Sequence, residues 1–227
     1  HCPGITLSML TEGALALTLQ EHKNMQSFAS KLMQALAKAV KVEITNPAGT
    51  NLSLSVEKRE FYTDTRMDWE SMRWMNLPTG EVIVAPIENS LNGKLVCDMA
   101  IGGIGPLKTP LEIQAKNGKA EKATCKDKEV LKKVEDTLAS DEWSNIIGEF
   151  AFGINPKARF TQEFLEAEKM LGTIHIAFGK NVDFPGGKNI SKNHMDMLIS
   201  KPTVNVTMED SAKITVLKEG HFTLKLQ

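Results

Sequence analysis

The chain has 227 residues, and its hydrophobic content of 41% is enough to bury an ordinary core in one large domain or two small ones. Its net charge of −1 argues against a partner such as nucleic acid or an anionic membrane, and no apolar run is long enough to span a bilayer. Its 3 cysteines lie far apart without a CxxC pair, which argues against a disulfide framework and a thiolate zinc site. We therefore expect a cytoplasmic protein.

The first part of the chain is predicted to contain one core-packed helix followed by strands. Apolar residues recur at helical spacing after Asn24, a residue suited to the N-cap. The turn-rich sequence Asn-Leu-Pro-Thr-Gly leads into the last of these strands and puts Glu81 at its mouth. The predicted elements are a helix at residues 24–40 and strands at residues 41–45, 51–56 and 81–85.

The middle of the chain is predicted to be mainly β-structure with one surface helix. The Asn-Gly pair at residues 117–118 is the strongest signal for a two-residue hairpin in the sequence. The glycine-rich residues 102–106 lack the helix start and the Lys-Ser/Thr of a phosphate-binding loop, so we interpret them as a corner between strands. The predicted elements are a turn at residues 92–93, strands at 94–99, 111–116 and from 119 onward, and a helix at 127–139.

The last third of the chain is predicted to consist of strands, a short helix and a closing β ribbon. One strand carries Glu149 among apolar neighbours, where a carboxylate is costly unless it is paired, hydrogen-bonded or bound to a metal. The predicted elements are strands at residues 145–153, 173–178 and 193–197, a helix at 161–170 and the ribbon at 203–227. As a whole the pattern predicts an α+β fold with mixed, largely antiparallel sheets and a few packing helices.

Polar residues at strand positions form a candidate metal site. Alternation at period two places His175 opposite the apolar face of its strand, and it places His194 and Asp196 on one face of another. Taken singly, a strand carboxylate or histidine is more often a salt-bridge or hydrogen-bond partner. Together the candidates exceed the needs of one tetrahedral zinc ion and suit two ions. They are Glu81, Glu149, His175, His194 and Asp196.

A series of short motifs extends over nearly the whole chain. They are His-Cys-Pro-Gly-Ile-Thr at residues 1–6, Asn-Leu-Pro-Thr-Gly-Glu-Val at 76–82 with Ala-Pro at 85–86, Gly-Glu at 148–149 through Gly-Ile-Asn-Pro at 153–156, Glu-Lys at 168–169 with Gly-Thr-Ile-His-Ile-Ala-Phe-Gly at 172–179, and His-Met-Asp at 194–196. In these motifs and their order the sequence resembles the thermophilic metalloproteases, or aminopeptidase T-like metallopeptidases.

The resemblance implies a metal-dependent aminopeptidase that hydrolyses the N-terminal peptide bond of peptides with a free N-terminus. It implies that the five candidate ligands hold two divalent ions, zinc or cobalt. Glu149 and Glu168 are then the candidates for moving a proton from water to the leaving nitrogen. The resemblance also implies a homodimer, and a catalytic domain at residues 1–227 that allows an internal boundary near residue 80. The family's N-terminal α/β domain would precede this segment.

The sequence departs from the family pattern shortly after His175. The best-studied branch has a tyrosine there that joins the metal site, whereas this chain has Lys-Asn-Val-Asp, and its single tyrosine, Tyr62, is distant in sequence. Asp183 or Asn181 could substitute, or the site could function without that residue. The Phe-Pro-Gly-Gly sequence in the loop at residues 181–189 looks more like the leucyl aminopeptidase branch, where a Phe-Gly-Gly type loop is usual.

Two alternatives to an aminopeptidase stay open from the sequence. One is a metal-dependent amide hydrolase of other specificity, and the other is a non-catalytic or incomplete fragment of such an enzyme. Three phenylalanines near the candidate ligands, Phe150, Phe178 and Phe184, could shape a pocket for a hydrophobic first residue. For Phe150 and Phe178, packing in the core is the better interpretation.

Overall fold

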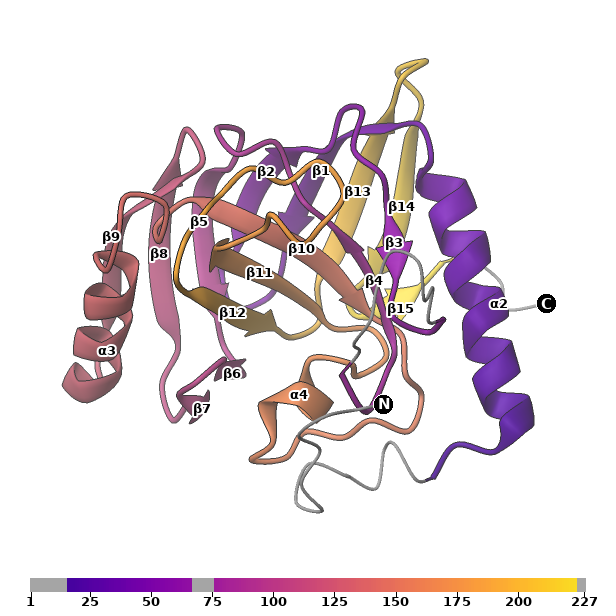
Figure 1. The fold of residues 1–227 in the computed structure, drawn as a ribbon, viewed down its shortest axis with the longest axis horizontal. Coiled ribbons are helices and arrows are strands. Elements are labelled where there is room, and N and C mark those ends of the chain that lie inside the picture. Colours follow the sequence, from indigo (N-terminus) through magenta and orange to yellow (C-terminus); the bar gives the residue numbers. More distant parts are fainter. Residues whose placement is uncertain (1–15, 67–75, 224–227) are drawn as a thin grey trace.

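The computed structural model describes residues 16–66 and 76–223 of the chain. Within these ranges the chain forms two sheets and three helices (Figure 1). One sheet has eight strands in the order β15-β14-β13-β1-β2-β5-β8-β9, and the other has seven in the order β3-β4-β10-β11-β12-β6-β7. Neighbouring strands pair antiparallel throughout both sheets. The predicted α+β class with largely antiparallel sheets is confirmed.

The eight-stranded sheet is built mainly from hairpins. Asn117 and Gly118 have φ values of 49° and 82°, as a two-residue type I′ turn requires, and the predicted hairpin is confirmed. The predicted turn at residues 92–93 is wrong, because these residues begin β5. Gly93 pairs there with Leu52, and a Cβ on it would lie 2.2 Å from the carbonyl oxygen of Asn51. The strands are β1 (Ala39–Thr45), β2 (Asn51–Ser55), β5 (Asn92–Cys97), β8 (Leu111–Lys116), β9 (Lys119–Cys125), β13 (Thr203–Met208), β14 (Lys213–Lys218) and β15 (His221–Phe222).

The seven-stranded sheet contains the strands that were predicted to carry the metal ligands. Residues 102–104 of the glycine-rich segment form a corner between two of its short strands, and Gly105 and Pro106 form the second of these strands. The strands are β3 (Tyr62–Thr63), β4 (Glu81–Val84), β6 (Ala100–Ile101), β7 (Gly105–Pro106), β10 (Ile147–Gly153), β11 (Ile174–Gly179) and β12 (His194–Ile199).

Three helices flank the sheets in the described part of the chain: α2 (Leu19–Leu36), α3 (Lys128–Leu138) and α4 (Phe164–Ala167) (Figure 1). The predicted start of the first helix at Asn24 is wrong. A capping box formed by Thr18 and Glu21 makes Thr18 the N-cap, six residues before Asn24, and Val40 lies in β1 instead. The predicted surface helix is confirmed with Asp127 as its N-cap, whereas α4 is much shorter than predicted. None of the described helices is long and apolar enough to cross a membrane.

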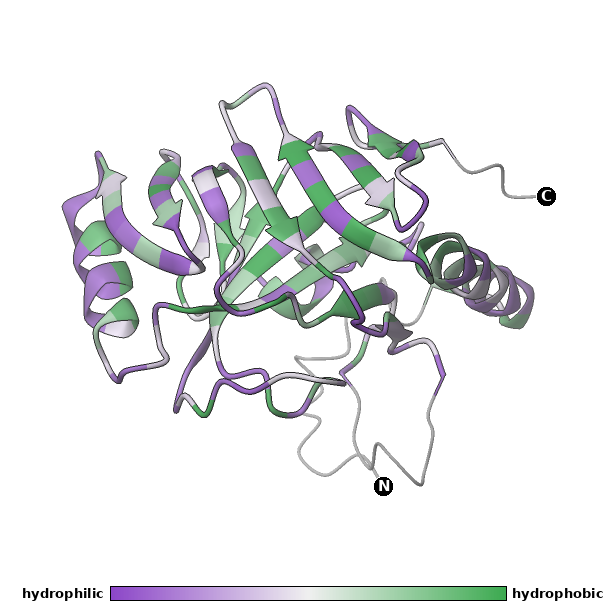
Figure 2. Ribbon diagram, turned by 90° about the horizontal axis from the view of Figure 1, so that it is seen from above, coloured by the Kyte–Doolittle hydropathy of each residue, from purple (hydrophilic) through white to green (hydrophobic). Residues whose placement is uncertain are grey.

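The two sheets share one hydrophobic core. Apolar and polar residues alternate along many strands and appear as green and purple bands in Figure 2. In β11, Ile174, Ile176 and Phe178 belong to this core, whereas His175 between them does not. In β12, Met195 and Met197 also belong to this core. The opposite face of the seven-stranded sheet is therefore free to carry polar side chains.

Candidate metal centre

The five predicted ligands lie together on the face of the seven-stranded sheet that is turned away from the shared core. Strand register brings them together, because Ala177 in β11 pairs with Glu149 in β10 on one side and with Asp196 in β12 on the other. The small side chain of Ala177 leaves room between the two carboxylates. Glu81 begins β4 on the far side of β10, where it pairs with Gly153.

A cavity of about 630 Å³ lies over this face of the sheet. Part of its wall comes from residues 180–184, a loop that sequence analysis had placed near the site. Glu168, which follows α4, also lines the cavity. The acidic residues and histidines that line it include all five predicted ligands and both candidates for proton transfer: Glu81, Glu149, Glu168, His175, His194 and Asp196.

The ligand atoms fall into two groups, each with its atoms within 4.8 Å of one another. Group 1 is Glu81, Glu168 and His175, and group 2 is Glu149, His194 and Asp196. Glu149 connects the groups, because its Oε1 lies 3.1 Å from Nε2 of His175 and its Oε2 lies 2.8 Å from Nε2 of His194. This arrangement of one carboxylate between two histidines can serve two cations at once.

The donor atoms fit divalent cations. Oε1 of Glu81 is buried and has no hydrogen-bond partner among the described residues, which is costly for a carboxylate unless a cation is bound. Nδ1 of His194 lies 2.7 Å from the carbonyl oxygen of Lys180, a contact that leaves Nε2 free to bind a metal. Oxygen and imidazole ligands of this kind suit zinc and related divalent ions.

Lys169 lies at the candidate metal centre, although sequence analysis assigned it no role. Its side chain is 1% exposed, and its Nζ lies 2.5 Å from Oε2 of Glu81 and 2.5 Å from Oε1 of Glu168. The backbone fixes this position, because the N–H of Asn155 donates to the carbonyl of Lys169 at 2.8 Å. The Glu-Lys pair at residues 168–169 is one of the motifs shared with the family, and it was the feature of the sequence that pointed to this lysine.

Asp64 is a second residue that the sequence did not reveal. It is buried, and its Oδ1 accepts hydrogen bonds from the backbone N–H groups of Gly80 at 2.9 Å and Glu81 at 2.7 Å. Burial, reinforced by the negative charge of Glu81, raises the pKa of Asp64 to about 7. Asp64 therefore fixes the backbone at the point where Glu81 enters the site.

Tyr62 is distant in sequence but lines the cavity in the structure. It lies in edge strand β3, where it pairs with Ile83 of β4, and its ring centroid is 5.6 Å from that of Phe184. Burial and the negative charges of Glu149 and Glu81 raise the pKa of Tyr62, so its phenol is neutral.

The three phenylalanines and the loop residues have separate positions. Phe150 and Phe178 are fully buried in the shared core, as the sequence favoured. Phe184 lines the cavity and packs edge-on against the His194 ring, with centroids 5.7 Å apart. Asn181 and Asp183, the candidates for replacing the family tyrosine, also line the cavity.

The electrostatics separate the two candidate residues for proton transfer. Burial would raise the pKa of Glu149, but hydrogen bonds and charge interactions with His175 and His194 lower it instead. Burial raises the pKa of Glu168 to about 8; the Lys169 ammonium opposes this shift, whereas the negative charge of Glu81 adds to it. Glu149 is thus a permanent anion, and Glu168 has a pKa near neutrality.

Both histidines of the site have raised pKa values in the absence of metal. Burial alone would lower the pKa of His175, but the hydrogen bond to Glu149 and the charges of Glu81 and Asp196 raise it to about 10. Burial likewise opposes protonation of His194, and Asp196 and Glu149 raise its pKa well above the usual value. Divalent cations must therefore compete with protons for these ligands.

The loop at residues 181–189 is fixed by a buried ion pair outside the metal centre. Arg59 and Glu88 form this pair at 2.6 Å, and Arg59 also donates to the carbonyl of Gly186. Glu88 accepts a hydrogen bond from the backbone N–H of Lys188 at 3.0 Å. Arg59 lies between β2 and β3, and Glu88 lies between β4 and β5, so two of the connections between the sheets hold this loop.

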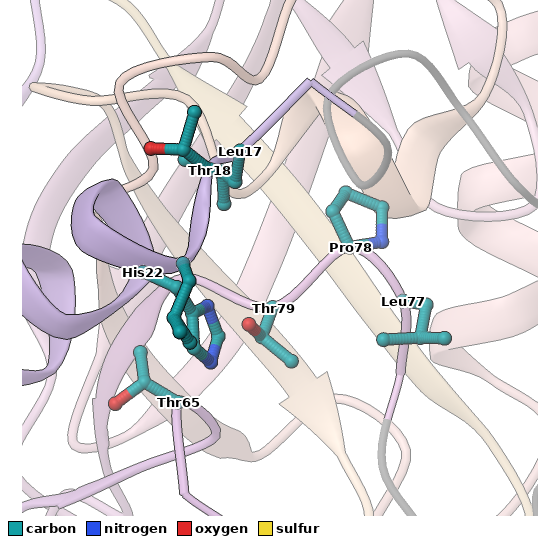
Figure 3. Close-up of a pocket in the computed structure, with 8 residues that line it drawn as sticks. Leu17, Thr18, His22, Thr65, Leu77, Pro78 and Thr79 are labelled. Atoms are coloured by element: carbon teal, nitrogen blue, oxygen red, sulfur yellow. The ribbon is translucent and has the colours of Figure 1, made fainter.

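A second pocket lies near the start of α2 and shares no lining residue with the cavity over the metal centre (Figure 3). Leu17, Thr65, Pro78 and Thr79 contribute to its wall. His22 is the one titratable side chain that lines it in the described part of the chain. This pocket therefore lacks the paired carboxylates and histidines of the first.

The sequence profile of the thermophilic metalloproteases (M29) matches residues 10–222. The chain belongs to this family. The resemblance inferred from the motifs is thereby confirmed. M29 membership implies the use of divalent metal, and the structure contains two groups of residues that could hold it.

Structural comparison of the M29 chain identifies two similar folds. AmpT from Thermus thermophilus has a TM-score of 0.76 and 19% sequence identity, and the match covers 92% of this chain and 56% of that one. The 2,5-dihydroxypyridine dioxygenase from Pseudomonas putida KT2440 has a TM-score of 0.72 and 17% identity, with coverages of 92% and 60%. The M29 chain thus spans less than two thirds of either neighbour. No curated protein sequence matches it.

Proposed function

We propose that this M29 protein is an aminopeptidase that releases the first residue of peptides with a free N-terminus, using two divalent ions. The observation that carries the proposal is the position of Glu149 between His175 and His194, with one carboxylate oxygen toward each. A carboxylate in this position suits a binuclear centre better than a single ion.

The residues that would hold the ions are the five predicted ligands. Glu81 and His175 would hold one ion, His194 and Asp196 the other, and Glu149 would bridge them. When bound, the ions would lower the pKa of a water molecule and polarise the scissile carbonyl. Zinc or cobalt is the expected metal, because the ligands are carboxylate oxygens and imidazole nitrogens.

Glu168 is the better candidate for proton transfer. Its pKa of about 8 lets it accept a proton near neutral pH and return it to the leaving nitrogen. Glu149 is less suited to this role, since its two histidine partners hold its pKa low. We therefore assign proton transfer to Glu168 and ligand binding to Glu149.

The cavity supports selection of a free amine and an apolar first side chain. A substrate ammonium is attracted by the carboxylates at the bottom of the cavity, whereas a blocked N-terminus lacks that charge. Apolar and aromatic side chains form part of the wall, and they favour a hydrophobic first residue. They are Tyr62, Ile83, Leu165, Val182 and Phe184.

We further propose that the protein is a cytoplasmic homodimer. The family resemblance supports the dimer. The free thiols of Cys97 and Cys125 support a reducing compartment.

The test of the proposed function compares the full-length, metal-loaded protein on leucine p-nitroanilide and on the N-acetylated analogue. An aminopeptidase cleaves the first and ignores the second, whereas cleavage of both would indicate an amide hydrolase of broader specificity. Replacing His194 with Ala should abolish hydrolysis and remove at least one bound ion per chain. Full activity of this variant would refute the proposal.

A further inference from the structure

The two ligand groups differ in whether a lysine ammonium contacts their carboxylates. In group 1, the ammonium of Lys169 lies between Glu81 and Glu168 and contacts an oxygen of each at 2.5 Å. The ammonium offsets one of the two negative charges that these carboxylates can carry. The position that a metal ion would take against these oxygens is therefore partly filled by a side chain of the protein itself.

Among the described residues, no lysine or arginine pairs with the carboxylates of group 2. The ion pairs of Asp196 are made to His194 and His175, and Glu149 pairs with the same two histidines. When the histidines are neutral, as metal ligands must be, Glu149 and Asp196 give this group two formal negative charges. The attraction for a divalent cation is accordingly stronger in group 2 than in group 1.

The histidines of the two groups also differ in orientation and exposure, and the difference again favours metal binding in group 2. His194 in group 2 is oriented by the Lys180 carbonyl at 2.7 Å from its Nδ1, and its side chain remains 28% exposed at the cavity. His175 in group 1 is 1% exposed, and its Nδ1 has no hydrogen-bond partner among the described residues. An oriented and accessible imidazole binds metal more readily than a buried one that lacks this support.

We propose that the two ion positions fill in order, and that Lys169 is an internal cation that decides when the second position becomes available. The first ion binds to group 2, while Lys169 neutralises Glu81 and Glu168. The second ion binds to group 1 only when it displaces the Lys169 ammonium from these carboxylates. This inference rests on the proposed two-ion site, and it assigns to that site a resting form with a single ion.

The displaced Lys169 ammonium has another acidic neighbour, because a third carboxylate interacts with it. Asp64 contributes a favourable charge interaction with Lys169 in addition to those of Glu168 and Glu81. Asp64 belongs to neither ligand group, so it remains near the ammonium when an ion occupies group 1. Catalysis with two ions would then begin only above the free metal concentration at which group 1 fills.

The test is metal binding by the chelator-treated, full-length protein, measured as ions per chain by equilibrium dialysis against cobalt(II). The wild type should bind one ion tightly and a second at a free metal concentration at least tenfold higher. In Lys169→Met, whose unbranched side chain is one atom shorter and uncharged, the second affinity should rise at least tenfold. Lys169→Arg keeps the charge and should retain the wild-type gap.

Two equal affinities in the wild type, or a second affinity unchanged in Lys169→Met, would overturn the inference while leaving the two-ion aminopeptidase intact. Binding of no ion at all would refute the proposed function itself. A measurement on the wild type alone serves if the variant fails to fold. In crystals with one equivalent of cobalt, anomalous density at His194 supports the order proposed here, and density at Glu81 and His175 contradicts it.

Discussion

Asp64 holds the backbone of Glu81 by accepting the hydrogen bond of its N–H group at 2.7 Å. Replacing Asp64 with Ala leaves the buried N–H groups of Gly80 and Glu81 without this acceptor. We expect a loss of about 1–3 kcal/mol in unfolding free energy, measured by urea denaturation. Metal affinity should fall as well, since Glu81 loses its fixed position.

The matched control for this substitution is Asp136→Ala. Asp136 pairs with Lys132 at 2.7 Å, but both side chains are exposed, and such a pair contributes at most about 1 kcal/mol. An Asp64→Ala protein with the stability and metal affinity of this control would contradict the role assigned to Asp64.

Glu168→Gln and Glu149→Gln should affect different steps. Glu168→Gln removes the group that exchanges a proton, so kcat should fall by about 10²–10⁴-fold while the ion of group 2 remains bound. Glu149→Gln removes the carboxylate shared by the two histidines and should lower the number of bound ions. The measurement pairs steady-state kinetics with elemental analysis of the same samples. Equal metal loss in both variants would remove the distinction between their roles.

The metal-free protein should lose stability as the pH rises from about 6.5 to 10. The pKa of His175 is about 10 in the folded state, above the ordinary histidine value of 6.5 expected in the unfolded chain. The folded state therefore binds this proton more tightly. The stabilisation is fully present below pH 6.5 and disappears as the pH passes through 10. Glu168, with a pKa of about 8, acts in the same direction between its usual range and pH 8.

This pH dependence is measured as the melting temperature of chelator-treated protein across that range. In His175→Gln the melting temperature should fall less steeply, because the responsible group is absent. A zinc-loaded sample should also depend less on pH in this window, since metal replaces the protons. Identical slopes for the wild type and His175→Gln would show that His175 is not the cause.

Phe184→Ala should change substrate preference more than it changes chemistry. Phe184 lines the cavity, and loss of apolar contact of this kind is worth about 1–3 kcal/mol in kcat/KM. The loss should be larger for leucine and phenylalanine anilides than for the alanine anilide. Ile190→Ala is the control immediately after this loop, because Ile190 is 72% exposed and outside the cavity wall. A uniform loss over all three substrates would remove Phe184 from the specificity pocket.

The positions of the candidate ligands on strands were predictable because their placement follows from a local rule. Period-two alternation put His175, His194 and Asp196 opposite apolar neighbours, and strand pairing then brought these strands together. The hairpin at Asn117 was predictable for the same reason, since its two turn residues determine its geometry.

The residues that the sequence did not reveal depend on contacts between distant segments. Tyr62 reaches the cavity because β3 pairs with β4 at the edge of the sheet. Asp64 accepts a hydrogen bond from the backbone of Glu81, which lies 17 residues later in the chain. Lys169 follows a four-residue helix and has no periodic pattern around it. The start of α2 was missed for another reason, because the capping box of Thr18 and Glu21 was present in the sequence but not used.

The ion pair of Arg59 and Glu88 separates substrate selection from metal chemistry in this fold. The candidate ligands are carried mainly by paired strands. Phe184 instead belongs to a loop that Arg59 and Glu88 hold against the β2–β3 and β4–β5 connections. A change at Arg59 would therefore reshape the cavity wall without touching a ligand. New substrate ranges could evolve in such a protein from positions well outside the metal centre, at little cost to the reaction itself.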